Sequence, residues 1–165
     1  MKTKPLLISI LVLVLIVLGY FIVPKLFKSS KPVENSIAVL PFINDSTNDS
    51  SAFFTNGIME EILNDLSNVD DMKVLSRTSV EPYRDATKSI AEIAKELNVV
   101  YILEGRVQKS GSKFNLIVQL IDAKNDNHLW SQSYEKEILK ADDIIALQTQ
   151  IAQAITTEIR ALITP

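Results

Sequence analysis

An uninterrupted run of residues without a charged side chain, 6–23, constrains this chain more than any other feature. Only Ser9, Gly19 and Tyr20 break its aliphatic character. As a helix the run is roughly 27 Å long, which matches the hydrocarbon thickness of a bilayer. Lysines flank it on both sides and no face of such a helix is polar, which argues against a helix buried in a soluble core. The run therefore predicts a single transmembrane helix.

A cleaved signal peptide is the alternative interpretation of this segment. Signal peptides have an apolar core of about 7–15 residues followed by a small-x-small cleavage site. The run at 6–23 is longer than that, and residues 23–27 (VPKLF) offer no such site. We therefore expect an uncleaved anchor. Lysines precede and follow the run in similar number, so the positive-inside rule leaves its orientation open.

The rest of the chain has a different composition. Residues 1–31 contain five lysines and no acid, whereas 32–165 carry a net charge of −8. We expect a short basic N-terminus at 1–5, a polar linker at 24–35 and one folded domain at 36–162. The acidic domain lacks the basic face of a nucleic-acid binder. With no Cys and a single His in the chain, we expect neither a metal site nor a cofactor.

Apolar periodicity predicts the elements of this domain. Phe54, Ile58, Ile62 and Leu66 recur every four residues and indicate one face of a helix over 52–68. The other expected elements are strands at 36–42, 72–76, 99–108, 114–121 and 128–134, and helices at 87–98 and from 142 or 143 onward. For the last helix we expect a buried side of Ile144, Leu147, Ile151, Ile155 and Leu162. The order β-α-β-α-β-β-β-α predicts an α/β domain, α+β-like, with helices packed on a mixed sheet.

Two glycines stand inside these elements. Gly57 lies early in the first helix, which it weakens, and so predicts tight packing on the sheet or an adjustment of the helix start. Gly105 lies in a central strand and predicts a bulge or the close approach of another backbone. Beside it, Glu104 is expected to be buried and paired with Arg77 or Arg106.

Seven ordered blocks in 36–160 resemble the TolB amino-terminal-like domain, a module that is also similar to the FlgO family. The first is IAVLPF at 37–42, followed by Asn44 and Ser46. The others begin at Phe54, Val74, Glu96, Gln119, Leu129 and Gln148. The resemblance implies a fold similar to anticodon-binding domains. In bacterial relatives this non-catalytic module accompanies adenylate cyclase, winged-helix or tetratricopeptide domains, often follows a transmembrane helix and faces away from the cytoplasm.

Three residues are candidates for ligand or partner contact: Arg77, Ser79 and Trp130. Arg77 with its neighbouring hydroxyls can hold a phosphate or carboxylate, but an Arg paired with a carboxylate of the domain is the simpler interpretation. Trp130 shares an expected strand face with Tyr134 and His128, which suits a ligand platform, although aromatic pairs more often cover a core. We identify no catalytic residue, because no Gly-x-Ser-x-Gly elbow or comparable motif accompanies His128.

These observations predict a membrane-anchored, non-catalytic bacterial protein in an envelope or signalling assembly. We expect a single span in the inner membrane, a periplasmic domain and a protein partner that binds a sheet edge or the groove beside the sheet. The alternative is a small-ligand-sensing accessory subunit of a separately encoded signalling protein, such as a cyclase or a transcription regulator. A hydrolase that uses His128 is a third and weaker hypothesis.

Overall fold

The computed structural model describes residues 13, 34–45, 49–137 and 143–163. The chain divides into two units, 1–31 and 32–165, and the second contains every element discussed below. Apart from residue 13, the expected transmembrane helix at 6–23 lies outside the described residues, as does most of the linker at 24–35. Among the residues that are described, no helix is long and apolar enough to cross a membrane.

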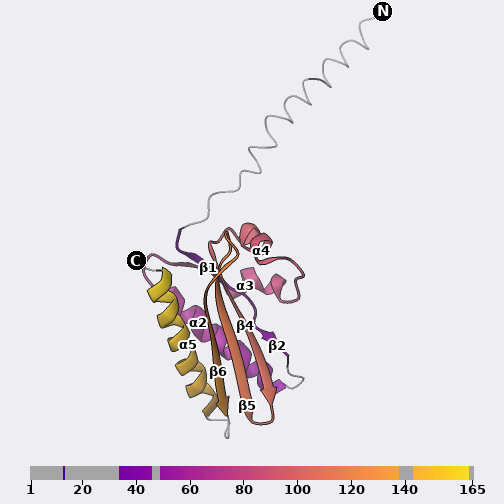
Figure 1. The fold of residues 1–165 in the computed structure, drawn as a ribbon, viewed down its shortest axis with the longest axis vertical. Helices are drawn as coiled ribbons and strands as arrows, with labels where there is room; N and C mark the ends of the chain where they lie inside the picture. The colour runs from indigo at the N-terminus through magenta and orange to yellow at the C-terminus, as the bar shows by residue number, and fades with distance from the viewer. Residues whose placement is uncertain (1–12, 14–33, 46–48, 138–142, 164–165) are drawn as a thin grey trace, which may run out of the picture. The chain divides into compact units, whose positions relative to one another are not determined.

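The domain is a mixed α+β unit in which a six-stranded sheet carries its helices (Figure 1). The expected elements follow one another in the predicted order, and three short elements at 43–44, 77–80 and 81–83 were not predicted. The strands are β1 (Ser36–Val39), β2 (Ile43–Asn44), β3 (Lys73–Val74), β4 (Tyr101–Ser110), β5 (Lys113–Asp122) and β6 (Asn127–Glu137). The helices are α2 (Asp49–Ser67), α3 (Arg77–Val80), α4 (Ile90–Leu97) and α5 (Asp143–Ile163), with a 3-10 turn η1 (Glu81–Tyr83) after α3.

The strand order is β3-β1-β4-β5-β6, with β2 also paired to β4. β1 runs parallel to both β3 and β4, whereas β4, β5 and β6 form an antiparallel meander. Pro41 interrupts the expected strand at 36–42, because proline has no N–H to donate to the ladder. The chain nevertheless stays on β4, since Leu40 N donates to Leu103 O and Asp45 N to Val107 O. β2 is the continuation of β1 beyond this proline.

The core lies between the sheet and the pair α2 and α5. The four α2 residues that the periodicity places on one face are all fully buried, as predicted. On α5, Ile151 and Ile155 are buried, but the expectation for Leu162 is wrong because 47% of this residue is exposed. Ile159 and Ile163 are buried in its place, since steps of four residues from Ile151 reach them and not Leu162.

Close packing explains both unusual glycines. A Cβ atom on Gly57 would lie 1.9 Å from Nε2 of Gln148. The glycine therefore makes room for a side chain of α5, and the expected packing against the sheet is wrong. Gln148 uses the space to donate hydrogen bonds to the carbonyl oxygens of Phe53 and Phe54, at 3.3 and 3.1 Å. A Cβ atom on Gly105 would lie 2.7 Å from the ring of Phe42. Close approach at Gly105 is thus confirmed, but the approaching group is a side chain.

Candidate functional site

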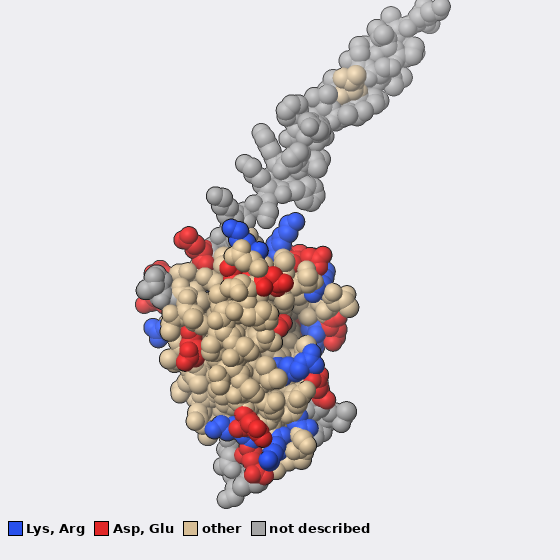
Figure 2. Space-filling view, in the orientation of Figure 1, with Lys and Arg blue, Asp and Glu red and all other residues tan. Residues whose placement is uncertain are grey.

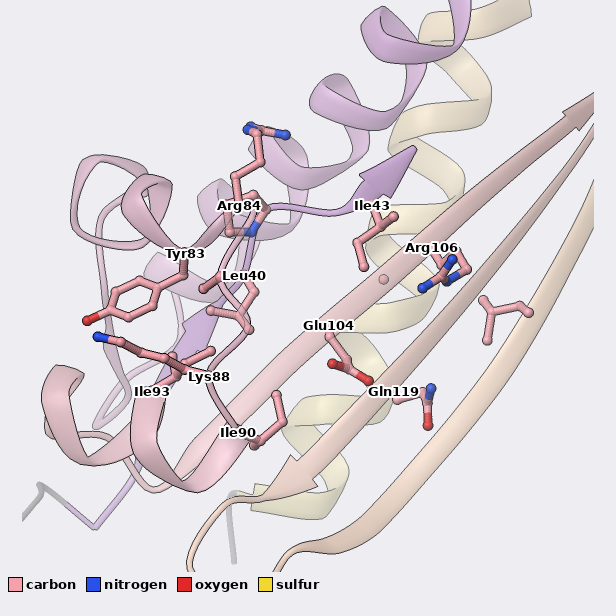
Figure 3. Close-up of a pocket in the computed structure, with 14 residues that line it drawn as sticks. Leu40, Ile43, Tyr83, Arg84, Lys88, Ile90, Ile93, Glu104, Arg106 and Gln119 are labelled. Atoms are coloured by element: carbon pink, nitrogen blue, oxygen red, sulfur yellow. The ribbon is translucent and has the colours of Figure 1, made fainter. Parts of the chain in front are cut away.

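A cavity of about 320 Å³ lies between the sheet and the segment that carries η1 and α4 (Figure 3). Its walls come from five elements far apart in the sequence: β1–β2, η1, α4, β4 and β5. The apolar part of the lining is Leu40, Pro41, Ile43, Ala86, Ile90, Ile93 and Ile117. Apolar walls with a few convergent polar groups are the usual composition of a binding site, and we treat this cavity as the candidate site.

Local sequence signals position the wall formed by α4. Ser89 is the N-cap, its Oγ accepts a hydrogen bond from Glu92 N, and the Glu92 carboxylate accepts one from Ser89 N. This reciprocal capping box satisfies two backbone donors at the helix start. The Glu92 carboxylate also accepts a hydrogen bond from Ser89 Oγ at 2.8 Å, and the hydrogen bonds that it accepts from the backbone and the side chain of Ser89 lower the pKa of the Glu92 carboxyl. Asn98 ends the helix in the left-handed conformation at φ 55°, which turns the chain directly into β4.

Ion pairs hold the cations at the rim on the η1–α4 side. Arg84 Nε donates to Glu81 Oε1 at 2.6 Å, and Lys88 Nζ donates to both Glu96 oxygens at 2.7 Å. The Arg84 guanidinium lowers the pKa of the Glu81 carboxyl, and the Lys88 ammonium lowers that of Glu96. Tyr83 joins the second pair, because its hydroxyl donates to Glu96 Oε2 at 2.9 Å. These contacts brace the loop between η1 and α4.

The opposite rim and the floor belong to β4 and β5. Arg106 donates to both oxygens of Asp45, at 2.9 and 2.7 Å, and lowers the pKa of that carboxyl. Glu104 stands directly opposite Gln119 in the register of the two strands, and both line the cavity. Within the described residues, the side-chain carboxylate of Glu104 makes no hydrogen bond or ion pair, so the expected pairing with Arg77 or Arg106 is wrong. Each of those arginines has a nearer carboxylate.

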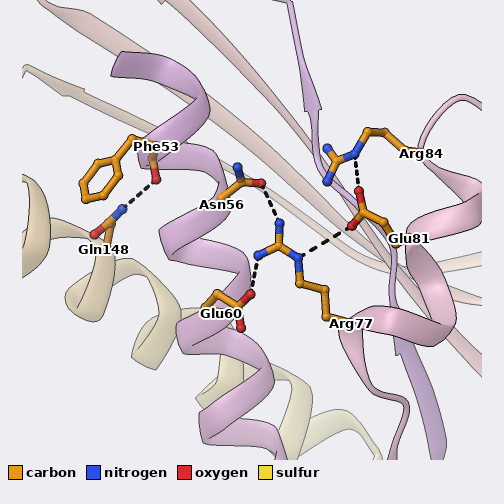
Figure 4. A network of polar contacts seen from close by, with 7 residues as sticks. All are labelled: Phe53, Asn56, Glu60, Arg77, Glu81, Arg84 and Gln148. Carbon is orange, nitrogen blue, oxygen red and sulfur yellow. Dashed lines mark hydrogen bonds and ion pairs between the residues drawn. The ribbon is translucent and has the colours of Figure 1, made fainter. Parts of the chain in front are cut away.

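Arg77 lies outside this cavity, at the first residue of α3 (Figure 4). Its guanidinium donates to Glu60 and, at 3.3 Å, to Asn56 Oδ1, both on α2, and its Nε lies 3.6 Å from Glu81. The hydrogen bond to Glu60 is the main cause of a raised Arg77 pKa. The network therefore ties α2 to the α3–η1 segment. This is the simpler of the two interpretations of Arg77 considered above.

The other two candidate residues, Ser79 and Trp130, do not line this cavity. Ser79 lies on α3, with its Oγ 3.0 Å from Ser76 Oγ. Trp130 lies on β6 and lines a separate groove beside α5, together with Tyr134. A register shift between Leu120 and Ile121 puts His128 opposite Ile121 and Trp130 opposite Leu120. Because adjacent residues of β5 point to opposite faces, His128 is not on the Trp130 face, and that expectation is wrong.

Sequence reasoning missed most of the cavity. Tyr83 and Arg84 lie in a stretch, 77–86, for which the pattern predicted no element. Lys88 was expected inside the helix at 87–98, whereas α4 begins at Ile90. Ile117 and Gln119 alternate with the buried residues of β5 and so lie on the face of this strand that lines the cavity. Proline at 41 and glycine at 105 were the available signals, since both mark places where a regular ladder changes.

The fold is that of a TolB-type α+β domain, as three solved structures show. Lipoprotein GNA1162 from Neisseria meningitidis aligns with a TM-score of 0.54 and 19% identity, over 76% of this chain and 96% of that chain. TolB from Acinetobacter baumannii gives 0.51 and 18%, over 80% and 29%. The PelC L103M dodecamer from Paraburkholderia phytofirmans gives 0.54 and 18%, over 77% and 90%.

The sequence comparisons identify the family. The model for the second domain of HilA/YgeH-like transcriptional regulators matches residues 33–154, and the chain belongs to this family. A curated relative, "Putative adenylate cyclase 3" of Rhizobium meliloti (strain 1021), is 35% identical over 133 residues. The match covers 81% of this chain and 22% of the relative, so the chain corresponds to about a fifth of that protein.

Proposed function

We propose that this protein is a non-catalytic accessory domain of a bacterial envelope or signalling assembly, held at the inner membrane by one helix at 6–23. In this proposal the α+β domain lies on the periplasmic side and binds a protein partner. The uncharged apolar run, the family and the TolB-type fold support the proposal. A closer relation to FlgO-type modules belongs to the same proposal. In this proposal, the adenylate cyclase activity in the relative's name belongs to the part of that longer protein that this chain does not match.

The cavity beside the sheet is the observation that carries the partner-binding role. A large part of its lining is aliphatic, and Ile43 at its margin is 45% exposed although it is a large aliphatic residue. The cations at its rim are already paired with carboxylates of the domain. Such a lining can bury an apolar side chain of a partner, with Glu104 the one lining carboxylate that is not already paired among the described residues, so we expect the partner to bring a hydrogen-bond donor beside its apolar group.

Site-specific photo-crosslinking in cells tests this role. A photo-reactive amino acid is placed at position 43, at the cavity, and as a matched control at 145, because Ile145 is 63% exposed on α5. We expect a discrete adduct of defined mass from position 43 that is absent from position 145. Identical adducts from both positions, or none from 43, would remove the support for this surface.

Membrane placement needs its own experiment. An alkaline phosphatase fused after Pro165 is active only when it is exported, so we expect activity in intact cells. A fluorescent cytoplasmic reporter at the same position should stay dark. The reverse result places the domain in the cytoplasm, and a mature chain about 25 residues shorter would show that the segment is a cleaved signal peptide.

Glu104 favours a second candidate function, the sensing of a small ligand. It is a half-buried carboxylate without a partner among the described residues, and it faces an apolar cavity beside Gln119. A ligand with a cationic or N–H group on an apolar body fits this lining. Thermal unfolding against a panel of amines should show stabilisation that is lost in Glu104→Gln and retained in Glu61→Gln. If no compound of the panel stabilises the protein in this way, the result counts against a sensing role.

A further inference from the structure

The strand β6 presents a long open edge. It is the last strand in the order β3-β1-β4-β5-β6 and pairs only with β5 among the described strands. Of residues 127–137, all but Trp130 and Tyr134 are exposed. Open edges of this length usually carry a proline or an inward-pointing charge that prevents pairing with another chain. The middle of β6, residues 130–134, has neither.

The sequence of this middle stretch is nearly symmetric about its centre. It reads Trp130-Ser131-Gln132-Ser133-Tyr134, an aromatic residue and a serine on each side of a glutamine. Trp130, Gln132 and Tyr134 line the groove between β6 and α5, whereas the two serines alternate to the other face. Such symmetry favours antiparallel pairing of the strand with a copy of itself, because residue i of one copy then meets its mirror position in the other and similar side chains stand opposite each other.

We propose that β6 pairs antiparallel with β6 of a second copy of this chain, about a two-fold axis that passes through Gln132. In this register Trp130 of each copy stands opposite Tyr134 of the other, and Ser131 stands opposite Ser133. Aromatic cross-strand pairs stabilise antiparallel sheets. The two aromatic pairs lie over the groove beside α5, which encloses about 560 Å³ and is open along the edge in the single chain.

Charge supports the second copy as the occupant. The regular pairing covers residues 130–134, because the register shift beside Leu129 interrupts the strand beyond Trp130. None of these five residues is charged, so no like charges stand opposite each other within the paired stretch. The wall of the groove on α5 is uncharged at Gln150, Gln153, Ala154 and Thr157, and Glu158 is the one charged residue in the lining. Figure 2 shows the same character, with a broad area free of charged side chains over β5 and β6 beside α5.

Disulfide cross-linking tests the axis directly, because the chain contains no cysteine. In Gln132→Cys the two thiols meet on the axis. Residues directly opposite in an antiparallel pair have Cα atoms about 4.5–5.5 Å apart, within the range of about 4.4–6.8 Å that disulfides span. We expect the full chain in detergent micelles to form a disulfide dimer readily on mild oxidation. The matched control is Asn64→Cys, at an exposed position of α2.

Register is tested by mixing two tagged variants. Ser131→Cys mixed with Ser133→Cys should give mainly the mixed dimer, whereas either variant alone should give much less. Equal yields from Gln132→Cys and Asn64→Cys would overturn the proposal. Equal yields of mixed and self dimers from the serine variants would also overturn it.

Paired charges provide a second test that does not depend on oxidation. Ser131→Lys/Ser133→Lys sets lysine against lysine twice across the axis, and Ser131→Lys/Ser133→Glu sets lysine against glutamate twice at the same positions. From the usual energies of cross-strand pairs, the first should dimerise roughly ten-fold more weakly than the second. The measurement is analytical ultracentrifugation in a density-matched detergent, with circular dichroism to verify that both variants fold. Equal dissociation constants in two folded variants would refute the pairing.

Discussion

Replacing Gly105 with alanine tests the account of how β1–β2 and β4 pack. The added Cβ would lie 2.7–2.8 Å from three ring atoms of Phe42, and that residue is 2% exposed and surrounded by core. The ring cannot rotate away as the end of a flexible side chain would. Gly105 does not have a positive φ, so alanine is compatible with its backbone and the clash alone should determine the cost.

Two opposing terms set the size of the effect. Overpacking of a core costs about 1–3 kcal/mol. Against it, alanine reduces the conformational entropy of the unfolded chain and stabilises by about 0.4–1 kcal/mol. We therefore expect Gly105→Ala to lower the free energy of unfolding by about 1–2 kcal/mol. Urea unfolding followed by the fluorescence of Trp130, the single tryptophan, measures this difference.

A double-mutant cycle determines whether Phe42 is the cause. Valine at position 42 has no atom beyond the γ carbons and removes the ring atoms that meet the new Cβ. In the Phe42→Val background, Gly105→Ala should therefore become neutral or slightly stabilising, by up to about 1 kcal/mol. If alanine costs the same in both backgrounds, the glycine is required for a reason other than the ring, and the packing argument is wrong.

Three further predictions concern the ends of elements and the acid range. Ser89→Ala removes the N-cap of α4 and should lower the free energy of unfolding by about 1 kcal/mol, with Ser89→Thr nearly neutral in the same urea experiment. Gly111 has φ +62°, and a Cβ atom added there would meet nothing within 4 Å, so backbone strain alone should set the cost of a side chain. Gly111→Val should therefore destabilise by at least about 1 kcal/mol and Gly111→Asn by much less, as melting temperatures will show. Lys88 holds the pKa of the Glu96 carboxyl below its ordinary value of 4.5. A carboxyl whose pKa is lower in the folded than in the unfolded chain stabilises the fold at any pH above its unfolded pKa, and this stabilisation is lost as the pH falls through its folded pKa. Stability should hence decline below about pH 4.5, and Glu96→Gln should make the decline shallower in urea titrations at a series of pH values.

Local periodicity was sufficient for the longer elements and their order, but not for the short elements β2, α3 and η1. The face of α2 follows from the spacing of four residues between Phe54 and Leu66, which needs no knowledge of the remainder of the chain. The turn at Ser110–Ser112 likewise follows from its glycine, because few other residues adopt a positive φ. The boundaries moved by one to three residues at most elements, as expected where a helix or strand frays.

Partners across the sheet and between helices did not follow from the sequence. Which carboxylate meets Arg77 depends on the packing of α3 against α2, and Glu60 is 17 residues away along the chain. The side of β6 that carries His128 depends on a register shift against β5. Neither feature leaves a periodic signal, since one extra residue in a strand exchanges its two faces without any change in composition.

The sequence by itself therefore determined an acidic α+β domain after an apolar, lysine-flanked segment, because hydrophobic periodicity and charge are local properties. Only the tertiary structure decided that β1 lies between β3 and β4, that Phe42 rests on Gly105, and that a cavity forms between the sheet and α4. Those features join residues about 60 positions apart, such as Arg106 and Asp45. Contacts over such distances arise from the way the whole sheet assembles, and no short window of the chain contains both partners.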